Sequence, residues 1–155
     1  MSQSRFEELV GEIARAIAER PLDNGLADHL NEAWPFGGKV FGELQELCAQ
    51  GEREGWLMAR EAGGIKFGRA VKPGTKAGGF SVDVVRMKDV CGPHHVHPNG
   101  EIGAVMPIEG APKFDAYPAG WYVYGPGSDH HPTVSGGDAY VLYLLPEGAI
   151  EFTGK

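Results

Sequence analysis

The chain has little cysteine: Cys48 and Cys91 are the only two among 155 residues. They lie too far apart to form a CxxC metal or redox motif, and two cysteines are too few for a disulfide-stabilised scaffold. Free thiols are typical of proteins that stay in the reducing cytoplasm. We therefore expect two reduced cysteines and a cytoplasmic location.

Long apolar runs are also missing. No segment approaches the roughly 20 apolar residues that a membrane-spanning helix requires. The N-terminal stretch MSQSRFEELVGE lacks the apolar segment of a signal peptide. We expect no membrane partner.

Positive charge is in deficit. The 14 Lys and Arg residues are outnumbered by 21 Asp and Glu residues, so the formal net charge is −7. Binding to a phosphate backbone needs a basic face, and the acidic N-terminal part offers no basic recognition helix, so we expect no nucleic-acid partner. A G-x-G-x-x-G element is absent as well, which argues against a dinucleotide cofactor.

Glycine and proline, by contrast, are abundant, with 24 and 11 residues that lie mostly after position 50. Frequent glycine and proline are typical of many short strands joined by turns. At this length we expect a single domain over 1–155, with a helical front at 1–52 and a β-barrel at 53–155.

The helical front is predicted from apolar spacing. Apolar residues recur every three to four positions and would form one stripe of a first helix: Phe6, Leu9, Val10, Ile13, Ala14 and Ile17. A second helix is expected from Asp23 or Asn24 to Trp34, and a third is expected to close at Gly51. Such a stripe packs against the core or against another subunit. If exposed, it favours a homodimer or larger homo-oligomer.

The rest of the chain alternates as strands do. In FSVDVVRM, the residues Phe80, Val82 and Val84 occupy alternate positions, as a half-buried strand requires. We expect roughly eight strands at spacings of about 6–12 residues, which indicates an antiparallel sandwich or barrel. No crossover helix is available to connect parallel strands. The predicted fold class is therefore mainly β with an N-terminal α region.

Histidine is concentrated in two places. All but one of the six histidines lie in CGPHHVHPNGE and in GPGSDHHPTV. On a strand, His95 and His97 point to the same side while His94 points away. The Pro-Asn-Gly turn at 98–100 can return Glu101 beside them. Two imidazoles and a carboxylate form an incomplete metal site, whose ligand types suit Fe(II), Mn(II), Zn(II), Ni(II) or Cu(II).

Together the two segments resemble the cupin family. Its first motif, G(x)5HxH(x)3–4E(x)6G, matches His95, His97 and Glu101, and its second motif, G(x)5PxG(x)2H(x)3N, matches Gly120 and His130. The resemblance implies a cupin-like antiparallel β jelly-roll barrel, here preceded by about three helices. It also implies a divalent transition metal, Fe2+, Mn2+ or Zn2+, held by the three histidines and Glu101.

The second motif departs from the family pattern. Pro126 and Gly127 are adjacent, whereas the motif separates them by one residue, and Val134 replaces the final asparagine. Counting from the glycine selects His130 as the third histidine ligand, and counting from the proline selects His131. We take His130 as the ligand and keep His131 as the alternative. The competing interpretation is a degenerate cupin whose histidines only form hydrogen bonds.

The whole layout is similar to a narrower group, the 4-hydroxylaminobenzoate lyases. A helical front at 1–52 precedes GPHHVHPNGEIG and AGWYVYGPGSDHHPTV. The resemblance implies a small aromatic substrate, because 4-hydroxylaminobenzoate and water would become 3,4-dihydroxybenzoate (protocatechuate) and ammonia. Two other classes share the ligand pattern, namely an Fe(II) dioxygenase or isomerase, and a non-catalytic cupin that binds a small molecule.

Candidate catalytic groups lie beside the metal motifs. Four residues carry groups able to transfer protons there: Glu101, His131, Tyr124 and Tyr140. Trp121 and Tyr122 have opposite parity on their strand, so at most one of them can face the barrel interior. A substrate carboxylate would also need an inward cation, which we expect among the five nearest the strands: Arg60, Lys66, Arg69, Lys72 and Arg86.

Overall fold

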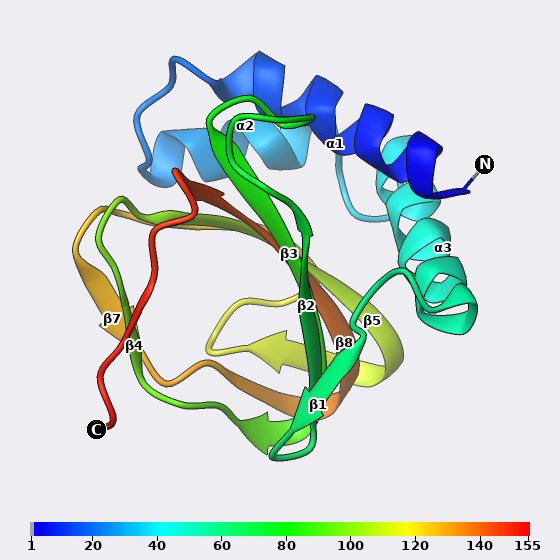
Figure 1. Cartoon of the computed structure of the whole chain (residues 1–155), viewed down its shortest axis with the longest axis vertical. Coiled ribbons are helices and arrows are strands. Elements are labelled where there is room, and N and C mark those ends of the chain that lie inside the picture. Colours follow the sequence, from blue (N-terminus) through cyan, green and yellow to red (C-terminus); the bar gives the residue numbers. More distant parts are fainter. Residues whose placement is uncertain (1) are drawn as a thin grey trace.

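Three helices and nine strands make up the described part of the chain, residues 2–155 of a computed structural model (Figure 1). The helices are α1 (Ser2–Ile17), α2 (Asn24–Ala33) and α3 (Lys39–Glu54). The strands are β1 (Arg60–Ala62), β2 (Ile65–Val71), β3 (Phe80–Cys91), β4 (His95–His97), β5 (Glu101–Phe114), β6 (Gly120–Tyr124), β7 (Ser128–His130), β8 (Thr133–Pro146) and β9 (Glu151–Phe152).

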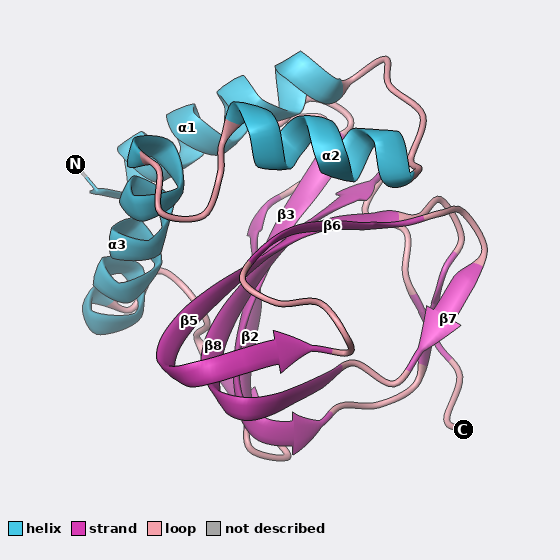
Figure 2. Cartoon of the chain, turned by 180° about the vertical axis from the view of Figure 1, so that it is seen from behind, coloured by secondary structure: helices cyan, strands magenta, loops and turns pink. Residues whose placement is uncertain are grey.

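The described strands pair in antiparallel fashion and form two sheets. One sheet has six strands in the order β1-β2-β3-β8-β5-β6, and the other has three in the order β7-β4-β9. The long strands β5 and β8 curve around the barrel, and β7 lies across it from them (Figure 2). The predicted fold, a cupin-like antiparallel jelly roll behind a helical front, is confirmed.

The helix ends follow local chemistry. Asp23 caps α2, since its Oδ1 accepts a hydrogen bond from the backbone N of Leu26 over 3.0 Å. The predicted stop at Gly51 is wrong, because α3 continues to Glu54 and ends at Gly55, which has φ 87°. Gly51 instead allows close packing, since a Cβ there would lie 2.7 Å from the side chain of Leu57. None of the described helices is both long and apolar enough to span a membrane.

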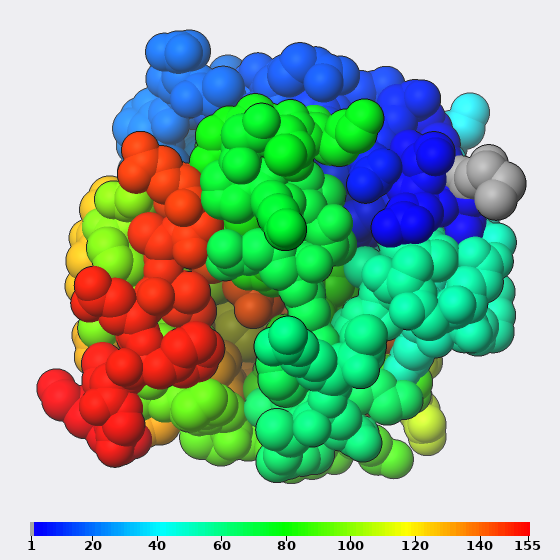
Figure 3. Space-filling model, viewed as in Figure 1, coloured from blue at the N-terminus to red at the C-terminus, as the bar shows by residue number. Residues whose placement is uncertain are grey.

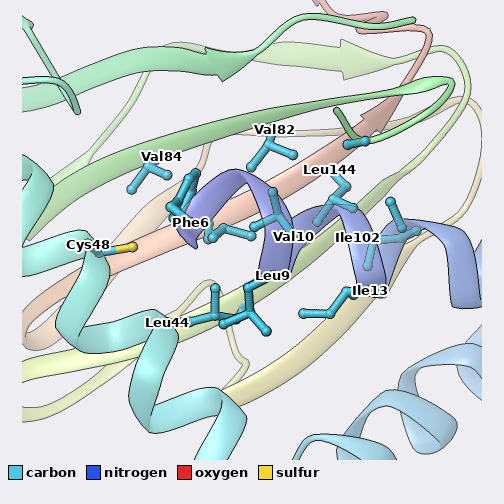
Figure 4. Close-up of a cluster of buried hydrophobic side chains, with 14 of the residues drawn as sticks. Phe6, Leu9, Val10, Ile13, Leu44, Cys48, Val82, Val84, Ile102 and Leu144 are labelled. Carbon is cyan, nitrogen blue, oxygen red and sulfur yellow. The ribbon is translucent and has the colours of Figure 1, made fainter. Parts of the chain in front are cut away.

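The helices cover the outer face of the six-stranded sheet (Figure 4). Residues of α1 and α3 contact residues of β3, β5 and β8 in one apolar layer, which includes Phe6, Leu9, Val10, Ile13, Leu44, Val82, Val84, Ile102 and Leu144. The opposite face of the same strands packs inside the barrel through Val85, Met87, Val105, Phe114 and Val141. Strand β3 is therefore buried on both faces along most of its length, whereas the alternation predicted a half-buried strand.

The apolar stripe of α1 is buried against the sheet of the same chain. Phe6 is 1% exposed and Ile17 is 0% exposed, because both face the sheet. The expectation of a homodimer or larger homo-oligomer depended on that stripe being exposed. The stripe therefore gives it no support.

Candidate metal centre

The predicted ligands meet at one point inside the barrel. His95 and His97 lie at the two ends of β4, and His130 ends β7 directly opposite His95 in the strand register. Glu101 is the first residue of β5, in the six-stranded sheet. The small sheet thus supplies three imidazoles and the large sheet supplies the carboxylate.

The tight turn after His97 makes this meeting possible. The backbone N of Gly100 donates to the carbonyl O of His97 over 3.1 Å, and Gly100 has φ 88°. A Cβ at this position would lie 2.6 Å from the side chain of Leu22 and 2.7 Å from the carbonyl O of Tyr124. Glycine is needed here both for its backbone conformation and for the space.

The Nε2 atoms of the three histidines form a small triangle. They are separated by 2.9 Å between His95 and His97, 3.0 Å between His95 and His130, and 3.1 Å between His97 and His130. Oε1 of Glu101 is 3.0 Å from Nε2 of His97, and the four ligand atoms lie within 4.8 Å of one another. Metal–nitrogen bonds of about 2.1 Å set at right angles place adjacent nitrogens about 3.0 Å apart, so this donor set fits a divalent transition metal.

Burial keeps the imidazole of His95 neutral. His95 is 7% exposed, and His97 and Glu101 are more deeply buried still. Burial first, and then the neighbouring imidazoles of His97 and His130, lower the pKa of His95 to about 4. His95 is therefore uncharged near pH 7 and has a lone pair free to bind a cation.

Tyr122 orients the carboxylate of Glu101. The Tyr122 hydroxyl donates to Oε2 of Glu101 over 2.6 Å, which leaves Oε1 facing His97. Burial, and then the adjacent Glu101 carboxylate, raise the pKa of Tyr122, so it keeps this proton at neutral pH. Across the strand pair, a Cβ on Gly103 would lie 2.1 Å from the Tyr122 ring. Gly103 therefore makes room for that ring.

The structure brings His130 to the cluster and leaves His131 outside it. His131 is exposed, and its Nε2 is 3.2 Å from the carbonyl O of Lys155. His94 also points away from the cluster, as its strand parity requires. Its Nε2 is 2.8 Å from Oδ2 of Asp129, and its ring packs against that of His131.

The two predicted catalytic tyrosines have other partners. Tyr140 faces the helices, and its hydroxyl donates to Oε1 of Glu52 on α3 over 2.6 Å. The sheet itself separates Tyr140 from the barrel interior, so we remove it from the candidate catalytic set. Tyr124 does lie beside His130, with ring centroids 4.7 Å apart, but its hydroxyl donates to Asp115. Of the pair with opposite parity, Tyr122 faces inward and Trp121 faces α2.

Asp115 is a polar neighbour of the cluster that the sequence did not single out. Its Oδ2 is 2.6 Å from Nδ1 of His130. In the sequence, Asp115 reads as a charge in the loop between two strands. No local pattern indicates that this loop folds back onto His130, because the contact depends on the packing of distant strands.

An apolar cavity of about 240 Å³ adjoins the cluster at His95 and Glu101. Its wall comes mainly from β2, β3 and β8, including Ile65, Phe67, Val85, Met87, Val141 and Tyr143. Ile150 and Phe152 of the C-terminal segment close another side, and the Phe152 ring meets the His95 ring edge-on at 5.5 Å. Figure 3 shows a hollow in the surface between this red segment and the teal and green residues of β1 and β2.

Among the candidate cations, Arg69 lies on the inner face of β2. It pairs in register with Asp83, which in turn lies opposite the cavity residue Tyr143 on β8. The Arg69 side chain is 36% exposed and binds the buried Asp83 carboxylate, with Nε 2.9 Å from Oδ1. Lys66 and Arg86 instead bind Glu52 on the outer face.

Comparison with known proteins identifies a family. A family model described as "PnbB: 4-hydroxylaminobenzoate lyase" matches residues 8–152. A protein named 4-hydroxylaminobenzoate lyase from Nocardioides sp. (strain LMS-CY) is 33% identical over 147 residues, which cover 88% of this chain and 86% of the relative. A protein of the same name from Pseudomonas putida is 26% identical over 169 residues and is matched over 96% of both chains.

Solved structures with a similar shape include an RmlC-like cupin protein from Ralstonia eutropha JMP134. Its TM-score is 0.44 at 13% identity, with 58% of this chain and 60% of that chain covered. Oxalate oxidase in complex with the substrate analogue glycolate has a TM-score of 0.45 at 24% identity, with 60% of this chain and 57% of that chain covered.

Proposed function

The chain belongs to the 4-hydroxylaminobenzoate lyase family, and on this basis we propose that it converts 4-hydroxylaminobenzoate and water into protocatechuate and ammonia. The observation that carries the proposal is a buried His3Glu cluster at the wall of an apolar cavity, in a chain matched to that family over most of its length. A divalent transition metal, Fe2+, Mn2+ or Zn2+, would be held by His95, His97, His130 and Glu101.

The size and lining of the cavity suit a single aromatic ring. Its volume of about 240 Å³ is below the roughly 300–1,000 Å³ of sites for drug-sized ligands. Phe67 and Phe152 offer apolar contacts to a ring, and most of the wall is apolar. The polar side chains in its lining are His95, Glu101 and Tyr143.

The reaction needs no external electron donor or acceptor. One 4-hydroxylaminobenzoate and one water contain the same atoms as one protocatechuate and one ammonia. Cleavage of the N–O bond reduces the nitrogen by two electrons, and the ring carbon that exchanges hydrogen for oxygen is oxidised by two electrons. The ring carbon that exchanges nitrogen for oxygen keeps its oxidation state, so the electrons balance within one molecule. A metal bound by the cluster would supply a Lewis acid that stabilises negative charge on an oxygen.

Tyr143 is the side chain best placed to donate a proton inside the cavity. It lines the wall together with Glu101. Burial first, and then the carboxylates of Asp83 and Glu101, raise its pKa, so the hydroxyl stays protonated at neutral pH. Because the hydroxyl keeps its proton, we assign Tyr143 the role of a hydrogen-bond donor that passes this proton to the substrate nitrogen or its departing oxygen as that atom becomes strongly basic.

Anaerobic turnover tests the proposed function. Purified protein loaded with one divalent metal per chain is expected to release protocatechuate and ammonia in a one-to-one ratio from 4-hydroxylaminobenzoate, without oxygen or NAD(P)H. Chromatography for protocatechuate and an enzymatic ammonia assay measure both products. Strict dependence on oxygen would instead favour a dioxygenase with the same ligands. Tight binding of the aromatic compound without turnover would favour a non-catalytic binding protein.

We propose Arg69 as the partner of the substrate carboxylate. A charge-assisted hydrogen bond contributes about 1.5–3 kcal/mol. Asp83 already shares this guanidinium, so we expect Arg69→Gln to lose a binding energy at the lower end of this range. KM should then rise about 10-fold with little change in kcat. Steady-state kinetics measure both constants.

A matched control for Arg69 lies on the same strand. Lys66→Gln removes the same charge from an ion-paired side chain of β2, but from the outer face. This variant is expected to leave KM unchanged. An equal rise of KM in both variants would show a general loss of positive charge and would remove Arg69 from the binding site.

A further inference from the structure

We propose that Asp115 is a positioning residue of the metal centre, which holds His130 in the one tautomer and orientation that can bind a cation. This inference rests on the proposed metal centre and adds a residue to which the motifs assign no role. The carboxylate does not reach the four-ligand cluster itself. It acts through the far side of the His130 ring.

Asp115 is itself held firmly in place. It directly follows β5 and has φ 54°, a conformation that aspartate tolerates better than most residues. Its backbone N donates to the carbonyl O of Thr133 over 2.7 Å, and its Oδ1 accepts from the backbone N of Thr133 over 3.0 Å. Both bonds connect Asp115 to the first residue of β8, so the carboxylate has a fixed direction.

The second carboxylate oxygen faces His130. Oδ2 of Asp115 lies 2.6 Å from Nδ1 of His130 and also accepts from the hydroxyl of Tyr124. An ionised carboxylate only accepts hydrogen bonds, so the His130 proton must be on Nδ1. Nε2 then carries the lone pair, and this is the atom that lies 3.0 Å and 3.1 Å from Nε2 of His95 and His97.

His130 is the ligand that most needs this support. Its side chain is 11% exposed, whereas that of His97 is fully buried. All three histidines stand at the ends of three-residue strands, so the greater exposure of the His130 side chain is what leaves its ring less constrained by packing. A hydrogen-bonded carboxylate on the far nitrogen of a metal-binding histidine typically improves metal affinity about 10- to 100-fold.

The test is metal affinity in Asp115→Asn, compared with wild type. Thr133 N and His130 Nδ1 meet different oxygens of the carboxylate, Oδ1 and Oδ2, and an amide has an oxygen at only one of these two positions, so it cannot accept from both. If its NH2 group faces His130, it favours the tautomer with the proton on Nε2, which cannot bind a metal. Competition of Zn2+ and Co2+ against a chromophoric chelator is expected to show a Kd raised about 10- to 100-fold.

The chain contains a matched control pair. Asp129 contacts Nε2 of His94 at 2.8 Å, in an aspartate–histidine pair that lies outside the cluster. Asp129→Asn is expected to bind Zn2+ and Co2+ with wild-type affinity. Tyr124→Phe, which keeps the carboxylate and removes only one of its donors, is expected to fall between wild type and Asp115→Asn. Circular dichroism and melting of the metal-free proteins show whether each variant is folded.

Four outcomes would overturn the inference. If folded Asp115→Asn binds both metals as tightly as wild type, only the role of Asp115 is refuted. The same conclusion follows if Asp129→Asn weakens binding equally. If wild-type protein binds neither metal, the metal centre fails and this inference fails with it. If Asp115→Asn is unfolded, Asp115→Glu provides the second measurement, and wild-type affinity in that folded variant with its displaced carboxylate would contradict positioning.

Discussion

Replacing His130 with alanine is expected to empty the metal centre and to lower kcat at least about 1,000-fold. The His130 Nε2 atom lies within 3.1 Å of those of both other histidines, so its loss opens one side of the site. A bound Lewis acid contributes several kcal/mol to the transition state, and each 1.36 kcal/mol is a factor of ten in rate. Elemental analysis and steady-state kinetics on the same preparation measure both effects.

The neighbouring histidine supplies the control. His131→Ala removes an exposed imidazole whose Nε2 contacts the backbone of Lys155, so metal content and kcat are expected to stay near wild type. The two variants differ by one position in the sequence: His130 is the last residue of β7 and lies in the cluster, whereas His131 follows the strand and is exposed. If His131→Ala lost the metal and His130→Ala kept it, the third histidine ligand would be His131 and the assignment of His130 would be refuted.

The Tyr143→Phe variant is expected to lower kcat about 100-fold while leaving the metal content unchanged. General acid–base groups typically contribute about 10²- to 10⁴-fold, and we expect the lower end because water can partly replace a proton donor. The ring remains, so the cavity wall and the binding of an aromatic substrate are preserved. Because the raised pKa keeps the wild-type hydroxyl protonated, the rate of the wild-type enzyme should not depend on its ionisation near pH 7.

Tyr140→Phe tests whether the position of the hydroxyl matters. Both tyrosines lie on β8, but the Tyr140 hydroxyl binds Glu52 beneath α3, on the other side of the sheet. Its removal is expected to destabilise the fold by about 1 kcal/mol and to leave kcat unchanged. A Tyr143→Phe variant with wild-type kcat would show that the proton comes from another group.

The residues that the sequence could place are those whose neighbours are close along the chain. The α1 stripe follows helical spacing, and His95, His97 and Glu101 are joined by one tight turn. For these, local geometry decides the contacts. The same holds for Asp23, which caps α2 through a hydrogen bond to Leu26 three residues later.

Other positions depend on contacts that no local pattern encodes. In AYVLYLL, both faces of β8 are buried, so apolar residues do not alternate with polar ones and the inner face cannot be read from the sequence. That is why Tyr140 was predicted to be catalytic although Tyr143 lines the cavity. Asp115 was missed for a related reason, since its contact with His130 forms only after β5, β7 and β8 are packed.

The two walls of the barrel differ in strength. The six-stranded sheet contains strands of 12 and 14 residues with helices packed behind it, whereas β4, β7 and β9 have three, three and two residues. Few interstrand hydrogen bonds hold the three-stranded sheet (the thin wall). The hydrogen bonds of its amides should therefore open locally far more often than those of the six-stranded sheet (the thick wall). An ion shared by His95, His97, His130 and Glu101 would clamp the thin wall to the thick one. Metal occupancy and slow hydrogen exchange in β4 and β7 would therefore be thermodynamically linked.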